Sequence, residues 1–423
     1  MSPAHIRVLL DADGMRPLLG TIPLLADGTA RLTAVSLDRL WVKPGRHFHA
    51  SYRVTLATET GPLETQATAS LLRSIREAAS PMRLAPRESR VPAATRWDVE
   101  RSTALVESPP LLLQLFPWDL RLPTLPIALD PRRVGEALDP ERLRSCTVVG
   151  YWPGIRCQLR YERADEPGVL YGKVFPDGAG SAAGRVQHAI ARRGESAAFQ
   201  TPRPRAYLPE LNLLLTEPVE GEPLLDLLRA APSRNVVGRV ATALAAFHAL
   251  GVPEVDRRFG PADDLAIVRG WVPLIGGIFP RLASPLGSAL AGLELAAPHD
   301  AVAVPVLVHR DFYDKQVLVG TSTIGFLDLD TVCQGDGEID VGNFCAHLVL
   351  RALQAGISTE AAERLGEVLV ASYRAARPAA DPRRVAWYRA SALLRLACVY
   401  ALRPWWHGLA PTLIDESRRT LEA

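Results

Sequence analysis

Residues 306–344 read VLVHRDFYDKQVLVGTSTIGFLDLDTVCQGDGEIDVGNF, and this stretch decides the fold of the C-terminal half. It predicts a strand, a loop, a second strand in VLVG, and a returning strand in TIGFLDLD after a turn at 320–323. A hairpin of this length brings Gln316 and Asp328 close together in space. Amide and carboxylate oxygens suit a hard cation such as Mg²⁺. Asp311 is then expected beside the cation, facing any hydroxyl that enters.

This arrangement is the one that phosphoryl transfer needs. The transferred group must be held in line, its charge must be neutralised by a metal, and the acceptor hydroxyl must be oriented by a base. The triplet HRD ends at Asp311, an amide side chain follows five residues later, and D-x-D begins twelve residues after Gln316. The alternative interpretation is an ordinary β-hairpin with surface carboxylates.

The stretch resembles the catalytic core of the aminoglycoside phosphotransferase and choline kinase-like family, relatives of the protein kinases. The family's loop reads H-G-D-x-x-x-x-N and is followed by I-D-x-D and by G-D-x-x-x-D-L; this chain has HRDFYDKQ, FLDLD and GDGEIDV. The resemblance implies that Asp311 is the catalytic base and that Asp328 ligates Mg²⁺. It also implies that Gln316 takes the place of the asparagine ligand and that Asp340 supports the catalytic loop.

Two positions depart from the family pattern. Arg310 replaces the usual glycine, which restores the HRD of protein kinases. Gln316 replaces asparagine and is one methylene longer, so it reaches the metal only if the loop shifts. A nucleotide-binding pseudokinase without turnover is therefore an alternative. A regulatory or scaffold protein whose N-terminal zone is the working surface is another.

The resemblance also places the nucleotide, either ATP or GTP. Lys173 in LYGKVF corresponds to the strand lysine that binds the α- and β-phosphates; a surface lysine on a strand edge is the alternative. TEPVEG at 216–221 corresponds to the hinge between the lobes, where the backbone near Glu217 and Val219 would contact the adenine of the nucleotide. The glutamate that would pair with Lys173 is hard to place, and Glu195 is the nearest candidate.

The coarse architecture predicted is α+β: a bilobal protein-kinase-like fold with a β-rich N-lobe at 131–221 and a helical C-lobe at 222–423. Short strands in TVVGY, CQLRY and VLYGKVF are separated by Pro-Gly turns, and a helix is expected over 180–193. Helices are then expected in NVVGRVATALAAFHALG and near 343–354, 359–376 and 383–402. His248 in the first of these is interpreted as a packed structural histidine.

Residues 1–130 are expected to form an extra β-rich cap domain, with short strands and one helical stretch near 66–79. The Pro-rich segment at 108–126 predicts an extended connector, and its leucines and aromatics are expected to be docked. KPGRHFHASYRV at 43–54 resembles WPGIRCQLRYER at 152–163, so the cap could be a degenerate copy of part of the N-lobe. Shared hairpin chemistry is the alternative. In a loose continuation of the match, Gln66 falls near the place of Lys173.

Composition excludes several classes of protein. The chain has 423 residues, a formal net charge of +2 and 48% hydrophobic residues. This balance favours neither a nucleic-acid nor a membrane partner, and neither is expected. Five cysteines without a C-x-x-C pair argue against a disulfide framework and a zinc site. No apolar run is long enough to span a membrane and no signal peptide is evident, so a cytoplasmic location is expected. Only three of the 48 basic residues are lysines, Lys173 among them.

The expected partner is a small-molecule hydroxyl acceptor: an aminoglycoside-like antibiotic, a peptide antibiotic, a sugar or an amino alcohol. Neither the acceptor nor the oligomeric state follows from the sequence. A cationic acceptor would need a cleft lined by carboxylates. The candidates are Asp263, Asp264, Asp314, Asp336 and Glu338.

Overall fold

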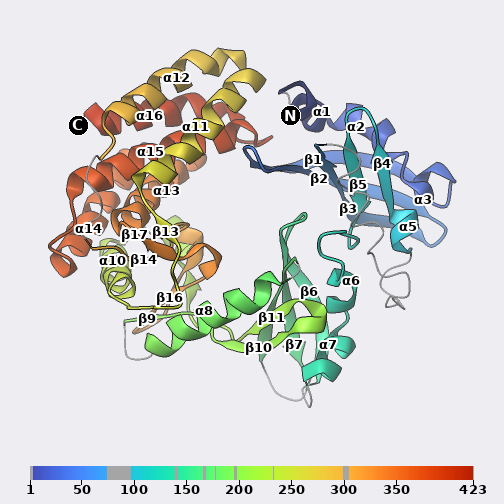
Figure 1. Cartoon of the computed structure of the whole chain (residues 1–423), viewed down its shortest axis with the longest axis horizontal. Helices are drawn as coiled ribbons and strands as arrows, with labels where there is room; N and C mark the ends of the chain where they lie inside the picture. Colours follow the sequence, from blue (N-terminus) through green and yellow to red (C-terminus); the bar gives the residue numbers. More distant parts are fainter. Residues whose placement is uncertain are drawn as a thin grey trace. The chain divides into compact units, whose positions relative to one another are not determined.

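The computed structural model in Figure 1 describes residues 3–73, 97–138, 142–164, 168–176, 178–194, 198–231, 233–298 and 304–422. The chain divides into two compact units. The first consists of the chain up to Gly184 together with Pro204–Glu217 and Leu402–Pro404. The second consists of Arg185–Arg203, Pro218–Ala401 and the chain from Trp405 onward. Strands dominate the first unit and helices the second, which confirms the predicted α+β class with a β-rich N-terminal region.

The N-terminal region is a five-stranded antiparallel sheet preceded by three short helices. The strand order is β1-β2-β3-β5-β4. The helices are α1 (Pro3–Leu10), α2 (Ala12–Leu19) and α3 (Pro23–Ala26), with α5 (Val99–Ser102) before β4; the strands are β1 (Arg31–Lys43), β2 (His47–Thr58), β3 (Gly61–Leu71), β4 (Thr103–Val106) and β5 (Leu111–Leu115).

The helix predicted near 66–79 is wrong over 66–71, and residues 74–79 lie outside the described part of the chain. Residues 66–71 belong to β3, which pairs with β2 along its whole length and with β5 over its second half. Two ladders of backbone hydrogen bonds outweigh the local helix preference of the alanines and glutamine in this segment. Tertiary pairing therefore decides the conformation.

The Pro-rich segment is more than a connector. Its leucines form β5, which lies between β3 and β4, and all five residues of the strand are buried. Farther along, Trp118 and Leu120 are also buried, and the segment ends in the short helix α6 (Leu125–Ala128). The segment is thus docked through its apolar side chains, as large buried side chains require.

A second five-stranded antiparallel sheet follows, in the order β6-β7-β8-β11-β10. Its first three strands confirm those predicted from TVVGY, CQLRY and VLYGKVF, and the helix expected over 180–193 is α8. The elements are α7 (Pro131–Leu138), β6 (Leu143–Trp152), β7 (Arg156–Arg163), β8 (Val169–Val174), α8 (Ala179–Arg193), β10 (Pro204–Leu208), η1 (Pro209–Leu211) and β11 (Leu213–Thr216).

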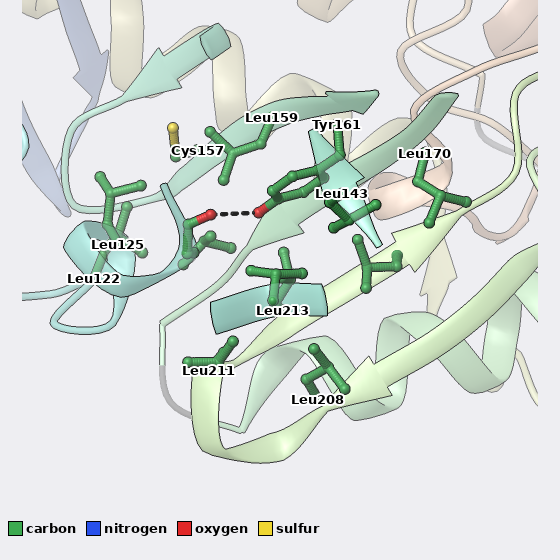
Figure 2. Packing of buried hydrophobic residues seen from close by; sticks show 14 residues of the cluster. Leu122, Leu125, Leu143, Cys157, Leu159, Tyr161, Leu170, Leu208, Leu211 and Leu213 are labelled. Atoms are coloured by element: carbon green, nitrogen blue, oxygen red, sulfur yellow. Dashed lines mark hydrogen bonds between the residues drawn. The ribbon is translucent and has the colours of Figure 1, made fainter. Parts of the chain in front are cut away.

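The core of this second sheet also includes residues from the segment before it. Figure 2 shows Leu122 and Leu125 packed in one cluster with strand residues such as Leu159 and Leu213. The hydroxyl of Tyr161, fully buried on β7, donates a hydrogen bond of 2.6 Å to the carbonyl of Ala128 in α6. The connector and the second sheet are therefore parts of one core.

The two sheets of the first unit share one strand order and the same antiparallel pairings. Tyr52 on β2 matches Tyr161 on β7: it is fully buried, and its hydroxyl donates a 2.6 Å hydrogen bond to the carbonyl of Leu9 in a preceding helix. His49 pairs with Ser70 in the first sheet as Gln158 pairs with Lys173 in the second. Ser70, and not Gln66 as predicted, stands at the place of Lys173.

The second unit holds two small sheets, ordered β12-β15-β16-β9 and β13-β17-β14, and most of the helices. The sequence analysis predicted α10 and α13 to α15 but missed α11 and α12, which contain interior prolines that it would read as breaks. In the described residues, no helix is both long and apolar enough to cross a membrane. The elements are β9 (Phe199–Gln200), β12 (Glu222–Pro223), α9 (Leu224–Ala230), α10 (Arg234–His248), β13 (Arg258–Phe259), α11 (Pro261–Ile278), α12 (Pro280–Leu295), β14 (Val306–Val308), η2 (Asp314–Gln316), β15 (Val317–Val319), β16 (Ile324–Phe326), η3 (Leu329–Thr331), β17 (Cys333–Gly335), α13 (Glu338–Ala355), α14 (Glu360–Ala376), α15 (Pro382–Ala401), η4 (His407–Leu409) and α16 (Ala410–Glu422).

We expect Tyr161→Phe to lower the free energy of unfolding by about 1–2 kcal/mol, because the buried carbonyl of Ala128 loses its hydrogen-bond donor. Tyr52→Phe should cost a similar amount through Leu9. Urea denaturation followed by circular dichroism measures both variants. If Tyr161→Phe were as stable as the wild type, the bond to Ala128 would have no energetic role.

Candidate active site

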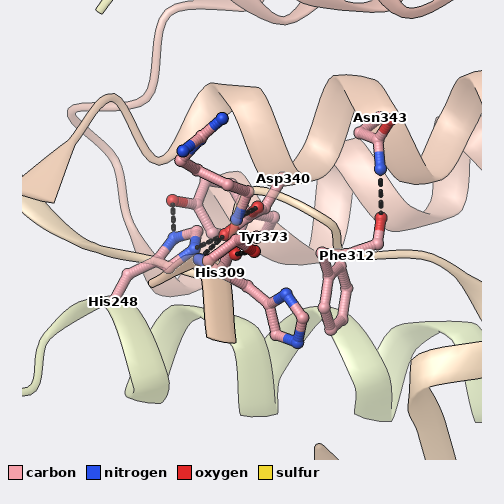
Figure 3. Close-up of polar contacts among 8 residues, drawn as sticks. His248, His309, Phe312, Asp340, Asn343 and Tyr373 are labelled. Carbon is pink, nitrogen blue, oxygen red and sulfur yellow. Dashed lines mark hydrogen bonds and ion pairs between the residues drawn. The ribbon is translucent and has the colours of Figure 1, made fainter. Parts of the chain in front are cut away.

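The catalytic-loop candidate begins where β14 ends, and a single carboxylate holds its backbone. Asp340, in the first turn of α13, is fully buried. Its Oδ2 accepts a hydrogen bond of 2.6 Å from the backbone N–H of His309, and its Oδ1 accepts one of 2.7 Å from the N–H of Arg310 (Figure 3). Hydrogen bonds to a charged acceptor are stronger than neutral ones. The backbone leading into Asp311 is therefore fixed.

Arg310 adopts a left-handed backbone conformation with φ of +68°. The family that this stretch resembles has glycine at this position. Glycine adopts the left-handed conformation without steric cost, whereas a residue with a Cβ adopts it at a cost. The guanidinium of Arg310 lies 3.8 Å from the centre of the Phe259 ring, and burial lowers the pKa of the group. This cation–π contact offsets part of the backbone strain, so the loop keeps its path with arginine in place of glycine.

His248 supports Asp340 from the end of α10. Its Nε2–H donates to Oδ2 of Asp340 at 3.0 Å, and its Nδ1 lies 2.7 Å from the hydroxyl of Tyr373 on α14. All three side chains are buried, and Figure 3 shows the hydrogen bonds that join them. His248 is a structural histidine, as its sequence context indicated.

Further hydrogen bonds hold the rest of the loop. Nε2–H of His309 donates to the carbonyl of Leu327 at 2.7 Å, and the hydroxyl of Thr331 donates to the carbonyl of His309 at 2.7 Å. The side-chain amide of Asn343 donates to the carbonyl of Phe312 at 2.9 Å (Figure 3). Sequence reasoning missed Asn343 and Thr331, because neither residue belongs to a motif and only the folded chain brings them to the loop.

The hairpin brings the backbone of Gln316 next to Leu327, the residue before Asp328. The N–H of Leu327 donates to the carbonyl of Gln316 at 2.9 Å, and Val317 pairs with Phe326. Asp328 does not lie within a strand, as FLDLD suggested, but two residues after β16, with φ of +58°. Asp328 stands directly before η3.

Asp328 and Gln316 were predicted to hold Mg²⁺, and their side chains offer oxygen donors of the kind that this ion takes. Mg²⁺ is usually held by one or two carboxylates, with substrate phosphates and water completing the octahedron. Among the residues that the structure describes, no group of three or more His, Cys, Asp or Glu side chains could hold a metal. Asp328 and Gln316 would contribute one carboxylate and one amide oxygen to a magnesium site.

The residues predicted to bind the nucleotide are distributed over both units. Lys173 lies on the central strand β8, paired with Gln158 on β7 and Leu214 on β11, and its Nζ is 5.8 Å from the centre of the Phe175 ring. Glu217 is the last residue of the first unit's second segment, and its carboxylate pairs with Arg163 at 3.2 Å.

Val219 belongs to the second unit, so the chain passes from one unit to the other within the segment predicted as the hinge. Glu195, the candidate partner of Lys173, lies outside the described residues.

The five carboxylates proposed for a cationic acceptor are engaged within the helical unit. Four are buried, and only Asp263 is exposed. Burial raises the pKa of Asp264 above its ordinary value. Their partners are the N–H of Gly260 for Asp263 at 2.9 Å, the hydroxyl of Ser391 for Asp264, Arg351 for Asp314 at 2.9 Å, Arg384 at 2.8 Å and Tyr388 at 2.7 Å for Asp336, and the N–H of Asp381 for Glu338 at 3.0 Å.

We expect Asp340→Asn to lower the free energy of unfolding by roughly 2–3 kcal/mol, because an amide offers one oxygen where two oxygens now accept three donors. Phosphotransfer should fall as well, since the loop loses its anchor. Asp263→Asn is the matched control, because this exposed carboxylate caps α11 alone. Urea denaturation of both variants gives the comparison, and equal losses would deny Asp340 a special role.

Several solved structures of phosphotransferases and kinases are similar to this chain. Macrolide 2'-phosphotransferase MphH from Brachybacterium faecium is 16% identical, with a TM-score of 0.44 over 70% of this chain and 96% of that one. Choline kinase from Cryptosporidium parvum Iowa II is 12% identical, with a TM-score of 0.48 over 67% and 89%. Aminoglycoside phosphotransferase APH(3'')-Id from Streptomyces rimosus is 19% identical, with a TM-score of 0.41 over 65% and 98%.

Among curated proteins, none matches the chain in sequence. The phosphotransferase enzyme family, APH, matches residues 158–388. That span is more than half of the chain, and it contains Lys173, Asp311, Asp328 and Asp340. The chain therefore belongs to the phosphotransferase enzyme family.

Proposed function

We propose that this chain transfers the γ-phosphate of ATP or GTP to a hydroxyl group of a small molecule, with Mg²⁺ as the metal. The observation that carries the proposal is the anchored loop, in which Asp340 fixes the two backbone amides before Asp311. A positioned base and a metal are the protein's main contributions to phosphoryl transfer. Family membership supports the same reaction class.

Asp311 is the proposed catalytic base. Its carboxylate would accept the proton of the acceptor hydroxyl as the new bond from that oxygen to the γ-phosphorus forms. The bond between the γ-phosphorus and the bridging oxygen breaks, and the nucleoside diphosphate leaves. A base held in place before the substrate arrives lowers the entropic cost of reaching the transition state. The hydrogen bonds on both sides of the loop supply that rigidity.

The remaining roles follow the sequence predictions. Asp328 and Gln316 would hold Mg²⁺, which neutralises charge on the phosphates. Lys173 would bind the α- and β-phosphates. The backbone near Glu217 and Val219 would contact the purine base of the nucleotide. The pairing of Lys173 between two neighbouring strands supports its role, because it fixes the direction of the side chain.

The acceptor would be an aminoglycoside-like antibiotic, a sugar or an amino alcohol. The engagement of Asp264, Asp314, Asp336 and Glu338 with partners in the helical unit weighs against an acceptor that carries several positive charges. We therefore favour a neutral hydroxyl compound such as a sugar. We also propose a cytoplasmic location, where the five free thiols would stay reduced.

A pseudokinase is the second candidate, and Gln316 is the observation that favours it. Its longer side chain places the amide oxygen differently from that of asparagine. Binding of a magnesium nucleotide without turnover would distinguish a pseudokinase from an enzyme. A scaffold protein, the third candidate, would bind no nucleotide.

Residues 1–130 are proposed to form a cap that is a degenerate copy of part of the N-lobe. The shared strand order and the matching bonds of Tyr52 and Tyr161 support the copy. With Ser70 at the place of the lysine, the first sheet lacks the phosphate-binding side chain. The cap would then act through the second sheet, with no site of its own.

Transfer of labelled phosphate from ATP to a panel of sugars, amino alcohols and aminoglycosides tests the proposed function. We expect Asp311→Asn to reduce the rate about 10²–10⁴-fold, because general-base help is lost. ATP affinity should change little, because the side chain faces the acceptor. Asp226→Asn is the control for an isosteric change at an exposed carboxylate of the same unit. Wild-type turnover in Asp311→Asn would refute the assignment of the base.

We expect Asp328→Ala to abolish the dependence of ATP binding on Mg²⁺, because the carboxylate ligand is removed. Gln316→Asn should keep or raise activity, whereas Gln316→Ala should lower it through loss of the amide oxygen. Calorimetry of ATP binding with and without Mg²⁺ measures the first effect, and turnover measures the other two. If Gln316→Ala matched the wild type, the amide would not touch the metal.

A further inference from the structure

The tip of the β6–β7 hairpin is residues 153–155, and both of its backbone N–H groups donate to partners within the first unit. Pro153 has no N–H, and the N–H of Ile155 donates to the carbonyl of Trp152 at 2.9 Å across the turn. Gly154 has φ of +67°, which favours glycine. Its N–H donates to a side chain from the N-terminal region, Asp119. The conformation of the tip is therefore set from inside the first unit.

Asp119 is a buried carboxylate that accepts three hydrogen bonds, and it is only 3% exposed. Its Oδ2 accepts from the N–H of Gly154 at 2.6 Å and from the hydroxyl of Tyr151 at 2.8 Å. Its Oδ1 accepts from the N–H of Arg121 at 2.9 Å. Burial raises the pKa of Tyr151 well above its ordinary value, and the negative charge of the neighbouring Asp119 raises the pKa further. The phenol therefore keeps its proton and donates a hydrogen bond to Asp119. Two of the three donors belong to the hairpin.

Aromatic contacts hold the same hairpin from the same region. The rings of Trp152 and Trp41 lie 5.7 Å apart between their centres, and those of Tyr151 and Phe116 lie 5.2 Å apart. A Cβ on Gly154 would come within 3.1 Å of Arg121 and 3.3 Å of His49. The tip thus packs closely against the N-terminal region.

The hairpin is continuous with the strand of the phosphate-binding lysine. Strand β7 pairs with β6 up to Arg156 opposite Trp152, and on its other edge it pairs with β8, where Gln158 is opposite Lys173. Only Cys157 lies between Arg156 and Gln158. We therefore expect a displacement of the tip to shift the pair that contains Lys173.

We propose that Asp119 is a positioning residue for the nucleotide: it fastens the β6–β7 hairpin, and with it the strand of Lys173, before a nucleoside triphosphate binds. This inference rests on the proposed function. It gives the N-terminal region a defined task, because Asp119 lies before the part of the chain that matches the family. Fixing the hairpin in advance removes an ordering cost from binding.

Two variants test the proposal. Asp119→Asn keeps the shape of the side chain but offers one oxygen and one NH₂ group, so at least one of the three donors loses its partner. Tyr151→Phe removes a single hydrogen bond and keeps the ring. Asp130→Asn is the matched control, because Asp130 Oδ1 accepts only from the nearby N–H of Arg132 among the contacts of its carboxylate that the structure describes.

The first readout is hydrogen exchange of a peptide that covers residues 151–156 in the full chain, which needs no turnover. Exchange should become roughly ten-fold faster in Asp119→Asn, as expected for loss of one charge-assisted hydrogen bond. The second readout is nucleotide binding. The KM for ATP and the Kd for ADP should rise roughly ten-fold in Asp119→Asn and about three-fold in Tyr151→Phe, with kcat almost unchanged.

Unchanged exchange in Asp119→Asn would overturn the proposal. Faster exchange with unchanged nucleotide affinity would also overturn it, and faster exchange with tighter binding would show that the carboxylate competes with the phosphates instead. A wild-type chain that binds no nucleotide would overturn the proposed function and the nucleotide role of Asp119 together. The exchange readout would still show whether Asp119 holds the hairpin.

Discussion

The second unit depends on one buried carboxylate. Asp340 accepts hydrogen bonds from two consecutive backbone amides of the loop and from His248, so it joins α10, α13 and the end of β14 at one point. An ionised carboxylate is costly to bury without partners, and these three donors supply the compensation. The position of Asp311 is a consequence, because Asp311 is the next residue after the second anchored amide. The backbone path of the candidate catalytic loop and the stability of this unit therefore depend on the same interaction.

The sequence predicted those parts of the site that lie close together along the chain. Asp311, Gln316 and Asp328 lie within one loop and hairpin, and the pairing of β15 with β16 that the sequence predicted joins the two halves of this segment. The strands β6 to β8 and the helix α10 carry clear local signals, and they too were predicted. Asp340 was placed by its motif. Its partner His248 was recognised only as a packed residue, because 92 positions separate the two.

Long-range pairing and packing explain what the sequence did not predict. Residues 66–71 have a local helix preference, yet two neighbouring strands make them β3. Helices α11 and α12 form in spite of Pro273 and Pro285, because burial of apolar side chains outweighs the lost backbone hydrogen bonds. The contacts of Asp119 with Tyr151 and Gly154 join segments that no motif connects. Hydrogen bonds of this kind are decided by the folded arrangement and leave no periodic signal in the sequence.

The shared strand order of the two sheets has a consequence for folding. A newly made chain carries two hairpins with similar turn sequences and tyrosines at matching places, so pairing between the wrong copies is a hazard, as in other proteins with internal repeats. Strand length separates them: β1 and β2 have 13 and 12 residues, whereas β6 and β7 have 10 and 8. A long strand paired with a short one leaves unmatched backbone groups, which penalises the crossed pairing. The difference in length thus disfavours pairing between strands of different sheets and favours pairing of the two strands within each hairpin.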